Sequence, residues 1–209
     1  MNMSSISPLL FVVSGPSGSG KGTLMKHVVE RFPEIRRVPT YTTREPRPGE
    51  VRDQDYRYVD ETTFNAHLDS GEIFECTRSY GSHLYGSPRK LLEVSDPSPL
   101  IVEMDYKGMF RIRASSRRHV VPLFVLPPLG KELEGRITGR SKESDLKARL
   151  EIGLDQLQFA WAYDYVVENL ELDKFMADIE HAVGAELLRA RGRQAMLDHR
   201  HDYDHTLVG

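Results

Sequence analysis

The stretch LLFVVSGPSGSGKGTLMKHVVERF, residues 9–32, decides the fold. Leu9–Ser14 is a short apolar run with β-branched residues that stops at Gly15, which predicts a buried strand. After the glycines, Leu24, Val28 and Phe32 recur four residues apart, which predicts an amphipathic helix. A strand, a glycine loop and a helix in this order are typical of the beginning of an α/β fold.

The glycine loop has the chemistry of a phosphate-binding site. In a loop of this kind, successive backbone N–H groups point at phosphate oxygens beside the positive end of a helix, and Lys21 can bridge the β- and γ-phosphates. The strict pattern places Ser or Thr directly after the lysine, whereas here Gly22 precedes Thr23. The flanking strand and helix favour a P-loop over a glycine-rich turn with a chance lysine. A P-loop indicates a phosphate ligand without identifying a reaction.

The same patterns predict the remaining elements. We expect a helix over residues 61–68 with Asp60 as its N-cap, and strands at Leu100–Met104, His119–Leu126 and Tyr165–Val167. An apolar stripe predicts another helix, formed by Leu146, Leu150, Leu154, Leu157 and Trp161, and a last helix is marked by Phe175, Ile179 and Val183. Strands that alternate with helices predict an α/β fold: a P-loop parallel sheet with helices on both faces.

Two polar segments, near residues 37–95 and 133–145, interrupt the alternation, and we expect moving parts there. Residues 33–59 are rich in arginine and proline, which predicts something other than core sheet. The core is then expected from residues 1–36, 96–132 and 146–209. The tail after Asp198 mixes His, Asp and Arg without periodicity, which predicts a frayed end.

Composition excludes several classes of protein. The chain has 209 residues, 39% hydrophobic and 28% charged, which is typical of a soluble globular protein. A net charge of −3 gives no general attraction to nucleic acid or to an anionic membrane. Cys76 is the one cysteine, so no internal disulfide can form, and no Cys/His cluster has zinc spacing. No apolar run approaches the ~18 residues of a membrane span. We therefore expect a cytoplasmic protein with no nucleic-acid or membrane partner.

The chain resembles the guanylate kinase family, a group of nucleoside monophosphate kinases. The resemblance begins with GPSGSGKGTL, continues through TYTTREPRPGEVRDQDYRYV and FECTRSYGSHLYGS, and extends to LIVEMDYKG, FVLPP, ELEGRITGRS and YDYVVEN. It covers roughly residues 9–180 in the family's order. Gly22-Thr23 fits this family better than the general P-loop pattern. The resemblance implies transfer of a phosphoryl group from ATP to GMP, with Mg²⁺ bound through ATP, a GMP-binding subdomain at 37–95 and a lid at 133–145.

The resemblance also implies the site residues. Arg44 and Arg47 supply two guanidinium forks for a dianionic phosphate, and the hydroxyls of Tyr56 and Tyr85 can donate to the same group. Glu75 is the expected guanine reader, because a carboxylate accepts from the two adjacent donors of guanine. The implied GMP-binding set is Thr40, Arg44, Arg47, Tyr56, Glu75, Tyr85, Ser87 and Asp105. The implied ATP-binding set is Gly15, Pro16, Ser17, Gly18, Ser19, Gly20, Lys21, Gly22, Thr23 and Asn169. The implied catalytic set is Lys21, Arg44, Arg136, Arg140 and Arg149.

No residue is assigned as a direct metal ligand. Three departures from the family pattern fall in loops that are expected to bind the nucleotides. Tyr41 stands where the family usually has a small residue, the Gly81–Tyr85 spacing is one residue longer than usual, and Ser141 follows Arg140 in place of Gly. The pair of aspartates usual in the family is Glu103 and Asp105 here, and their roles stay open, with the base and the water shell of Mg²⁺ as alternatives.

Two other functions stay open at this point. One is a kinase of a phosphorylated ribose on a similar fold, against which Thr40, Glu75 and Ser87 argue, since a sugar phosphate needs no base reader. The other is a non-catalytic guanylate-kinase-like binding module, against which Lys21 and the lid arginines argue. The sequence gives no indication of the oligomeric state.

Overall fold

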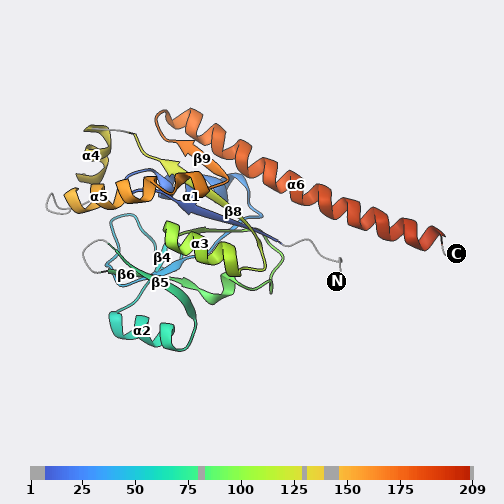
Figure 1. The fold of residues 1–209 in the computed structure, drawn as a ribbon, viewed down its shortest axis with the longest axis horizontal. Coiled ribbons are helices and arrows are strands. Elements are labelled where there is room, and N and C mark those ends of the chain that lie inside the picture. Colours follow the sequence, from blue (N-terminus) through green and yellow to red (C-terminus); the bar gives the residue numbers. More distant parts are fainter. Residues whose placement is uncertain (1–7, 80–82, 129–130, 139–145, 208–209) are drawn as a thin grey trace.

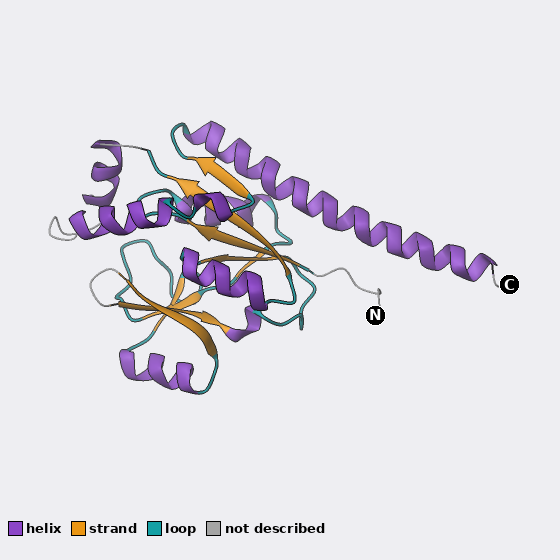
Figure 2. Cartoon of the chain, viewed as in Figure 1, coloured by secondary structure: helices purple, strands orange, loops and turns teal. Residues whose placement is uncertain are grey.

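Two β-sheets form the centre of the molecule (Figures 1 and 2). The computed structural model describes residues 8–79, 83–128, 131–138 and 146–207. The five-stranded core sheet has the order β2 (Arg36–Arg37), β7 (Leu100–Glu103), β1 (Leu9–Ser14), β8 (His119–Leu126), β9 (Tyr165–Glu168). The four-stranded small sheet has the order β4 (Tyr56–Tyr58), β3 (Thr40–Thr42), β6 (His83–Pro88), β5 (Ile73–Ser79).

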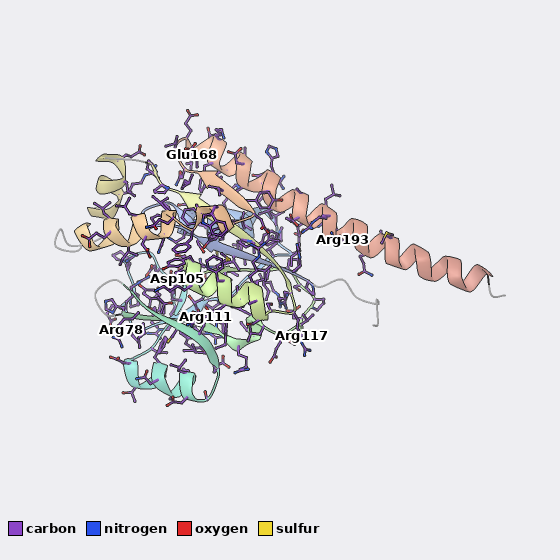
Figure 3. All side chains as sticks on the ribbon, in the orientation of Figure 1. Arg78, Asp105, Arg111, Arg117, Glu168 and Arg193 are labelled. Atoms are coloured by element: carbon purple, nitrogen blue, oxygen red, sulfur yellow. The ribbon has the colours of Figure 1, made fainter. Side chains whose placement is uncertain are left out.

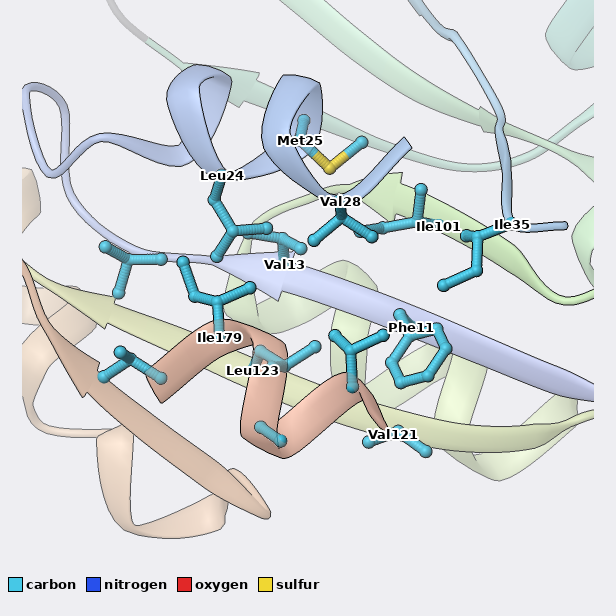
Figure 4. Packing of buried hydrophobic residues seen from close by; sticks show 14 of the residues in the cluster. Phe11, Val13, Leu24, Met25, Val28, Ile35, Ile101, Val121, Leu123 and Ile179 are labelled. Atoms are coloured by element: carbon cyan, nitrogen blue, oxygen red, sulfur yellow. The ribbon is translucent and has the colours of Figure 1, made fainter. Parts of the chain in front are cut away.

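The core sheet is parallel throughout and is covered on both faces. All six residues of β1 are buried, as expected for the central strand of a doubly covered sheet. Phe11 and Val13 pack against α1 (Lys21–Arg31) and α6 (Leu172–Leu207) (Figure 4). Leu10 and Val12 pack with α3 (Tyr106–Ser115) on the opposite face. This arrangement confirms the predicted fold class.

The small sheet has its own apolar cluster. Tyr41, Phe64, Ile73 and Leu84 are all buried together between the sheet and α2 (Glu61–Asp69). Asp60 caps α2 as predicted, because its side chain accepts a hydrogen bond from the backbone N–H of Thr63 at 2.7 Å. Val38 and Pro39 alone connect β2 of the core sheet to β3 of the small sheet. The chain therefore crosses between the two sheets in a very short step.

Three sequence predictions are wrong in part. Arg36–Arg37 joins the core sheet beside β7, although residues 33–59 were expected outside it. Main-chain hydrogen bonding needs no apolar side chain, so composition missed this strand. The tail after Asp198 continues α6 as a helix to Leu207.

The third prediction that is wrong in part is the apolar stripe of α5 (Leu146–Leu157). Leu154 is 65% exposed, and Trp161 is 80% exposed and lies in a separate 3₁₀ turn, Ala160–Ala162. The side of α5 that is buried instead carries Gly153 and Gln156, because a Cβ at Gly153 would lie 3.2 Å from Cβ of Pro16 in the glycine loop. The helix therefore faces the loop with a small residue rather than with the leucine stripe.

A further helix, α4 (Lys131–Thr138), occupies part of the polar segment 133–145. Among the described helices, none is long and apolar enough to span a membrane.

Candidate functional site

A cleft of about 1100 Å³ lies between the core sheet and the small sheet. The carboxyl ends of β1 and β7 open into it, which is where parallel sheets bind their ligands. Residues of both sheets line it: Gly15, Ser17, Gly18, Gly20, Lys21, Gly22, Thr23, Arg37, Thr40, Arg44, Arg47, Glu50, Asp55, Tyr56, Glu75, Tyr85, Ser87, Glu103, Asp105 and Gln156 among them. Two segments far apart in the sequence therefore share one cavity.

The shape of the glycine loop is fixed by the conformation of Gly20 and by a hydrogen bond from Asn169. Gly20 precedes α1 with a φ of 104°, a left-handed conformation that favours glycine. Nδ2 of the buried Asn169 donates to the carbonyl oxygen of Ser19 at 2.7 Å. A Cβ at position 20 would lie 2.1 Å from that same Nδ2. Gly20 is therefore required both by its backbone and by the asparagine packed under it.

Lys21 lies across the loop at the floor of the cleft. Its Nζ donates to the carbonyl oxygens of Gly15 and Pro16, at 2.7 and 2.9 Å. Oε1 of Glu103, at the end of β7, lies 3.7 Å from the same Nζ. The lysine charge is thus held beside the loop whose amides would receive phosphate oxygens.

Arg44 and Glu50 form the basic corner of the cleft. The two guanidinium nitrogens of Arg44 each donate to one oxygen of Glu50 at 2.7 Å. Glu50 also accepts from the Arg47 backbone N–H and from the Tyr58 hydroxyl, both at 2.8 Å. Burial alone would raise the pKa of Glu50, but these donors outweigh it and lower the pKa to about 2. Burial likewise opposes the charge on Arg44, and the Glu50 pairing raises the pKa of Arg44 above its ordinary value.

Two tyrosines stand beside Arg44. The guanidinium carbon of Arg44 lies 4.9 Å from the Tyr56 ring centroid, and the rings of Tyr56 and Tyr85 meet edge to face at 6.2 Å. Burial, with the nearby charge of Glu103, raises the pKa of Tyr56 well above its ordinary value. Tyr56 therefore keeps its proton and can donate a hydrogen bond to an anion in the cleft.

Glu75 is a buried carboxylate at the small-sheet wall. Its Oε1 accepts from the Ser87 hydroxyl at 2.5 Å, and its Oε2 is buried without a hydrogen-bond partner among the described residues. Burial, with the nearby charge of Asp105, raises the pKa of Glu75. A ligand that donates hydrogen bonds to Oε2 would remove this desolvation cost.

Asp105 lies at the junction of the two sheets (Figure 3). It caps α3, since Oδ1 accepts from the backbone N–H of Gly108 at 2.8 Å. Its charge acts on Glu75 from the core side of the cleft. A structural role as a helix cap and a place beside the candidate base reader are both compatible with this position.

Known proteins resemble this chain in both sequence and fold. The family model for guanylate kinase matches residues 7–186. A guanylate kinase from Nitrobacter hamburgensis is 34% identical over 90% of this chain and 87% of its own, and one from Paramagnetospirillum magneticum is 35% identical over 90% and 89%. The chain belongs to the guanylate kinase family. The crystal structure of guanylate kinase from Anaplasma phagocytophilum superimposes with a TM-score of 0.68 at 29% identity and 87% coverage of both chains.

The cleft brings together most of the residues that the guanylate kinase resemblance implies. All eight of the expected GMP-binding residues line it, as do Lys21 and six other expected ATP-binding residues: Gly15, Ser17, Gly18, Gly20, Gly22 and Thr23. Pro16, Ser19 and Asn169 are not among the lining residues. Asn169 supports the loop backbone from behind.

The lid arginines of the guanylate kinase pattern are described only in part. Arg136 lies in α4 and donates to Glu132, one turn earlier, at 2.7 Å. Arg140 falls outside the described residues. The backbone of Arg149 lies in α5, and its side chain is not among those described.

Of the three departures from the family pattern, Tyr41 fills the small-sheet core and its hydroxyl donates to Glu72 at 3.1 Å. The lengthened loop includes residues 80–82, which the structure does not describe.

Among the cleft residues that sequence reasoning missed are four polar ones: Arg37, Glu50, Asp55 and Gln156. Glu50 could have been found, because it lies three residues after Arg47 in the arginine-rich segment. Arg37, Asp55 and Gln156 carried no signal of their own. Gln156 is 7% exposed, and its Oε1 is buried without a partner among the described residues.

The oxygen donors at the loop fit a magnesium ion that arrives with nucleotide. Thr23 offers a hydroxyl in the first turn of α1, and Glu103 and Asp105 offer carboxylates at the end of β7. These are the hard ligands that Mg²⁺ prefers, and it commonly binds through few protein groups and substrate phosphates. No group of three or more His, Cys, Asp or Glu among the described residues could hold a metal by itself. The donor set therefore suits a metal shared with phosphate.

Proposed function

We propose that this protein transfers the γ-phosphoryl group of ATP to GMP, giving ADP and GDP. The observation that carries the proposal is the single cleft in which Lys21 and the glycine loop face Arg44, Tyr56 and Glu75. A donor triphosphate on the loop and an acceptor monophosphate at the basic corner would meet in this cavity. Its volume of about 1100 Å³ is ample for two nucleotides that enter from opposite ends.

The proposed transfer needs no protein nucleophile. An oxygen of the acceptor phosphate attacks the γ-phosphorus in line, its bond to oxygen forms as the bond to the β-phosphate oxygen breaks, and ADP leaves. Lys21 and the loop amides stabilise the charge on the transferring group, and Arg44 and Arg47 hold the acceptor. When bound with ATP, Mg²⁺ neutralises phosphate charge, and Thr23, Glu103 and Asp105 are the residues that would hold it directly or through water.

Guanine recognition rests on the buried carboxylate. Glu75 Oε2 has no partner among the described residues, so the two adjacent donors of guanine would satisfy this wall of the cleft. Adenine presents an unprotonated ring nitrogen there, which would leave the buried charge facing an acceptor. Thr40 and Ser87 line the same wall, and Tyr56 and Tyr85 would donate to the acceptor phosphate.

Two parts of the chain are proposed to move. Residues 37–95 would form the GMP-binding subdomain, and residues 133–145 a lid that carries Arg136 and Arg140, with Arg149 on the helix that follows. Water must be kept from a γ-phosphate that is held for transfer, and closure of such segments does this in kinases. The core is then formed by residues 1–36, 96–132 and 146–209.

A coupled assay of ADP formation tests the function. The purified chain is offered ATP and Mg²⁺ with GMP, AMP, UMP or ribose bisphosphate in parallel. We expect turnover with GMP and at least tenfold lower efficiency with the other acceptors, on the scale of one matched charged hydrogen bond, ~1.5–3 kcal/mol. Preference for ribose bisphosphate would identify a sugar-phosphate kinase, and binding of GMP without turnover would identify a non-catalytic module.

A further inference from the structure

An ion pair joins the core sheet to the wall of the acceptor site. Arg37 is the last residue of β2, and its Nη1 donates to Oδ1 of Asp55 at 2.6 Å. Both side chains are largely buried, with 18% and 23% of their surface exposed. Both line the cleft. The pair therefore connects two segments 18 residues apart at the edge of the active site.

Asp55 also organises the turn in which it lies. Its second oxygen, Oδ2, accepts from the backbone N–H of Val51 at 2.8 Å, and its own backbone N–H donates to the carbonyl of Val51 at 2.9 Å. Asp53, inside this turn, has a φ of 63°, a left-handed conformation that costs free energy outside glycine. A turn of this kind persists only when its surroundings hold it.

The turn leads directly into Tyr56, at the beginning of an edge strand. β4 lies at the edge of the small sheet and pairs there with β3, with Tyr56 opposite Thr40. On the side away from β3, the backbone pairing described for β4 is an isolated bridge between Arg52 and Tyr56, which comes from the turn itself. Asp55 attaches the residue before the strand to β2, which hydrogen-bonds to β7 and belongs to the core sheet.

We propose that Arg37 is a positioning residue for the acceptor phosphate site. Through Asp55 it holds the turn and the start of β4, and so places the Tyr56 ring beneath Arg44. This inference rests on the proposed function, because it assigns Tyr56 to the acceptor phosphate. It concerns the acceptor alone, since the glycine loop makes no contact through this pair.

The geometry favours positioning over direct contact with phosphate. Nη1 of Arg37 is committed to Asp55, and Nε is buried without a hydrogen-bond partner among the described residues. The pair with Asp55 already places a carboxylate at Nη1, so a phosphate could reach this guanidinium without displacing Asp55 only at its other edge. Arg44 also pairs with a carboxylate, but both of its terminal nitrogens and the ring of Tyr56 converge at one corner of the cleft.

The test is a double-mutant cycle. Arg37→Gln, Asp55→Asn and the double variant are compared with the parent for KM and kcat with GMP and with ATP, and Arg37→Lys tests rescue by a retained charge. Arg113→Gln is the matched control, because Arg113 pairs with Asp164 across two elements at 3.1 Å and neither residue lines the cleft. Hydrogen–deuterium exchange of residues 51–58 in the unliganded protein measures how firmly the backbone of the turn is held, without reference to catalysis.

We expect each single variant to raise the KM for GMP about tenfold, within the range of coupled neighbouring residues, with KM for ATP within about twofold of the parent. The double variant should be no worse than either single variant, Arg37→Lys should recover part of the loss, and exchange over residues 51–58 should rise in the two single variants but not in Arg113→Gln.

Other outcomes overturn the proposal. A lower KM for GMP in Asp55→Asn would make Arg37 a direct phosphate ligand that Asp55 restrains. Positioning through the pair would be excluded if the effects of the two single variants on the KM for GMP added in the double variant. It would also be excluded if the KM for GMP and the KM for ATP rose equally, or if hydrogen–deuterium exchange of residues 51–58 did not change. If the parent itself gives no turnover with GMP, the proposed function fails, and exchange alone then decides whether Arg37 holds the turn.

Discussion

Lys21 spans the glycine loop with its charge already directed to two loop carbonyls. Lys21→Met removes that charge and keeps an unbranched side chain that is one atom shorter. We expect kcat with GMP to fall by about a hundred- to a thousandfold, the loss seen when one transition-state donor is removed. Circular dichroism and thermal unfolding check that the variant is folded. Turnover within tenfold of the parent would exclude the loop as the place of transfer.

The proposed function makes acceptor choice depend on Glu75. Glu75→Gln replaces one of two acceptor oxygens by a donor, so we expect kcat/KM for GMP to fall roughly ten- to a hundredfold, as for one charged hydrogen bond. The same amide can donate to the ring nitrogen of adenine, so the ratio of kcat/KM for GMP to that for AMP should fall further. An unchanged ratio would make Glu75 structural.

The buried position of Glu75 also predicts a pH dependence. Burial raises the pKa of this carboxyl above the ordinary glutamate value of 4.5. A group with a raised pKa takes up its proton at a higher pH, so the charged form that accepts from guanine is lost earlier as the pH falls. The KM for GMP should therefore rise on acidification from neutral pH, while the KM for ATP changes less. Glu75→Gln should abolish the difference between the two profiles.

At the scale of an element, the segment Arg44–Tyr58 folds around one carboxylate. Glu50 has a pKa lowered to about 2 from 4.5, so its charged form stabilises the folded state. That contribution is fully present above pH 4.5 and is lost as the pH falls toward about 2. Urea unfolding at pH 7 and pH 3 should therefore show a smaller difference for Glu50→Gln than for the parent. Equal differences would mean that the four hydrogen bonds of Glu50 carry no net stability.

The elements also show where sequence reasoning succeeds. Leu9–Ser14 and His119–Leu126 were predictable, because a strand buried on both faces must be apolar throughout. Arg36–Arg37 was not, since an edge strand two residues long leaves no periodicity to detect. The prediction that the leucine stripe of α5 is buried was wrong in part, because an apolar face is buried only if another element lies opposite it. Leu154 faces outward.

The residue types of the candidate site were predictable from the sequence, but the contacts between residues of different elements were not. Arginines near prolines and tyrosines after a P-loop indicate an anion site from residue chemistry alone. The Arg37–Asp55 pair depends on how the small sheet is set against the core sheet, and no local pattern encodes that distance. The helical tail beyond Asp198 shows the same limit, because helix formers such as Leu, Arg and Gln before it extend α6 without an apolar stripe.

At the scale of the whole molecule, the core sheet has an apolar cluster on each face and the small sheet has one of its own, and together they support the two ends of the cleft. Phe64 is fully buried in the small-sheet cluster, so Phe64→Ala should lower the free energy of unfolding by ~3–5 kcal/mol. Because that cluster holds the acceptor wall, the KM for GMP should rise while the KM for ATP stays within about twofold. Trp161→Ala is the control: at 80% exposure it should change stability by less than ~0.5 kcal/mol. An equal rise in the KM for GMP and the KM for ATP would mean that the small sheet and the core sheet do not respond separately.

Cys76, next to Glu75 on β5, gives the protein a built-in reporter. Neighbouring residues of a strand point to opposite faces, so Glu75 lines the cleft while the thiol of Cys76 packs against the small-sheet cluster. It is the one cysteine of the chain and is half-buried. A thiol reagent therefore labels a single position, at a rate set by how often the small sheet loosens. The labelling rate of Cys76 with and without GMP would measure how often the small sheet opens locally, and the protein needs no engineered probe.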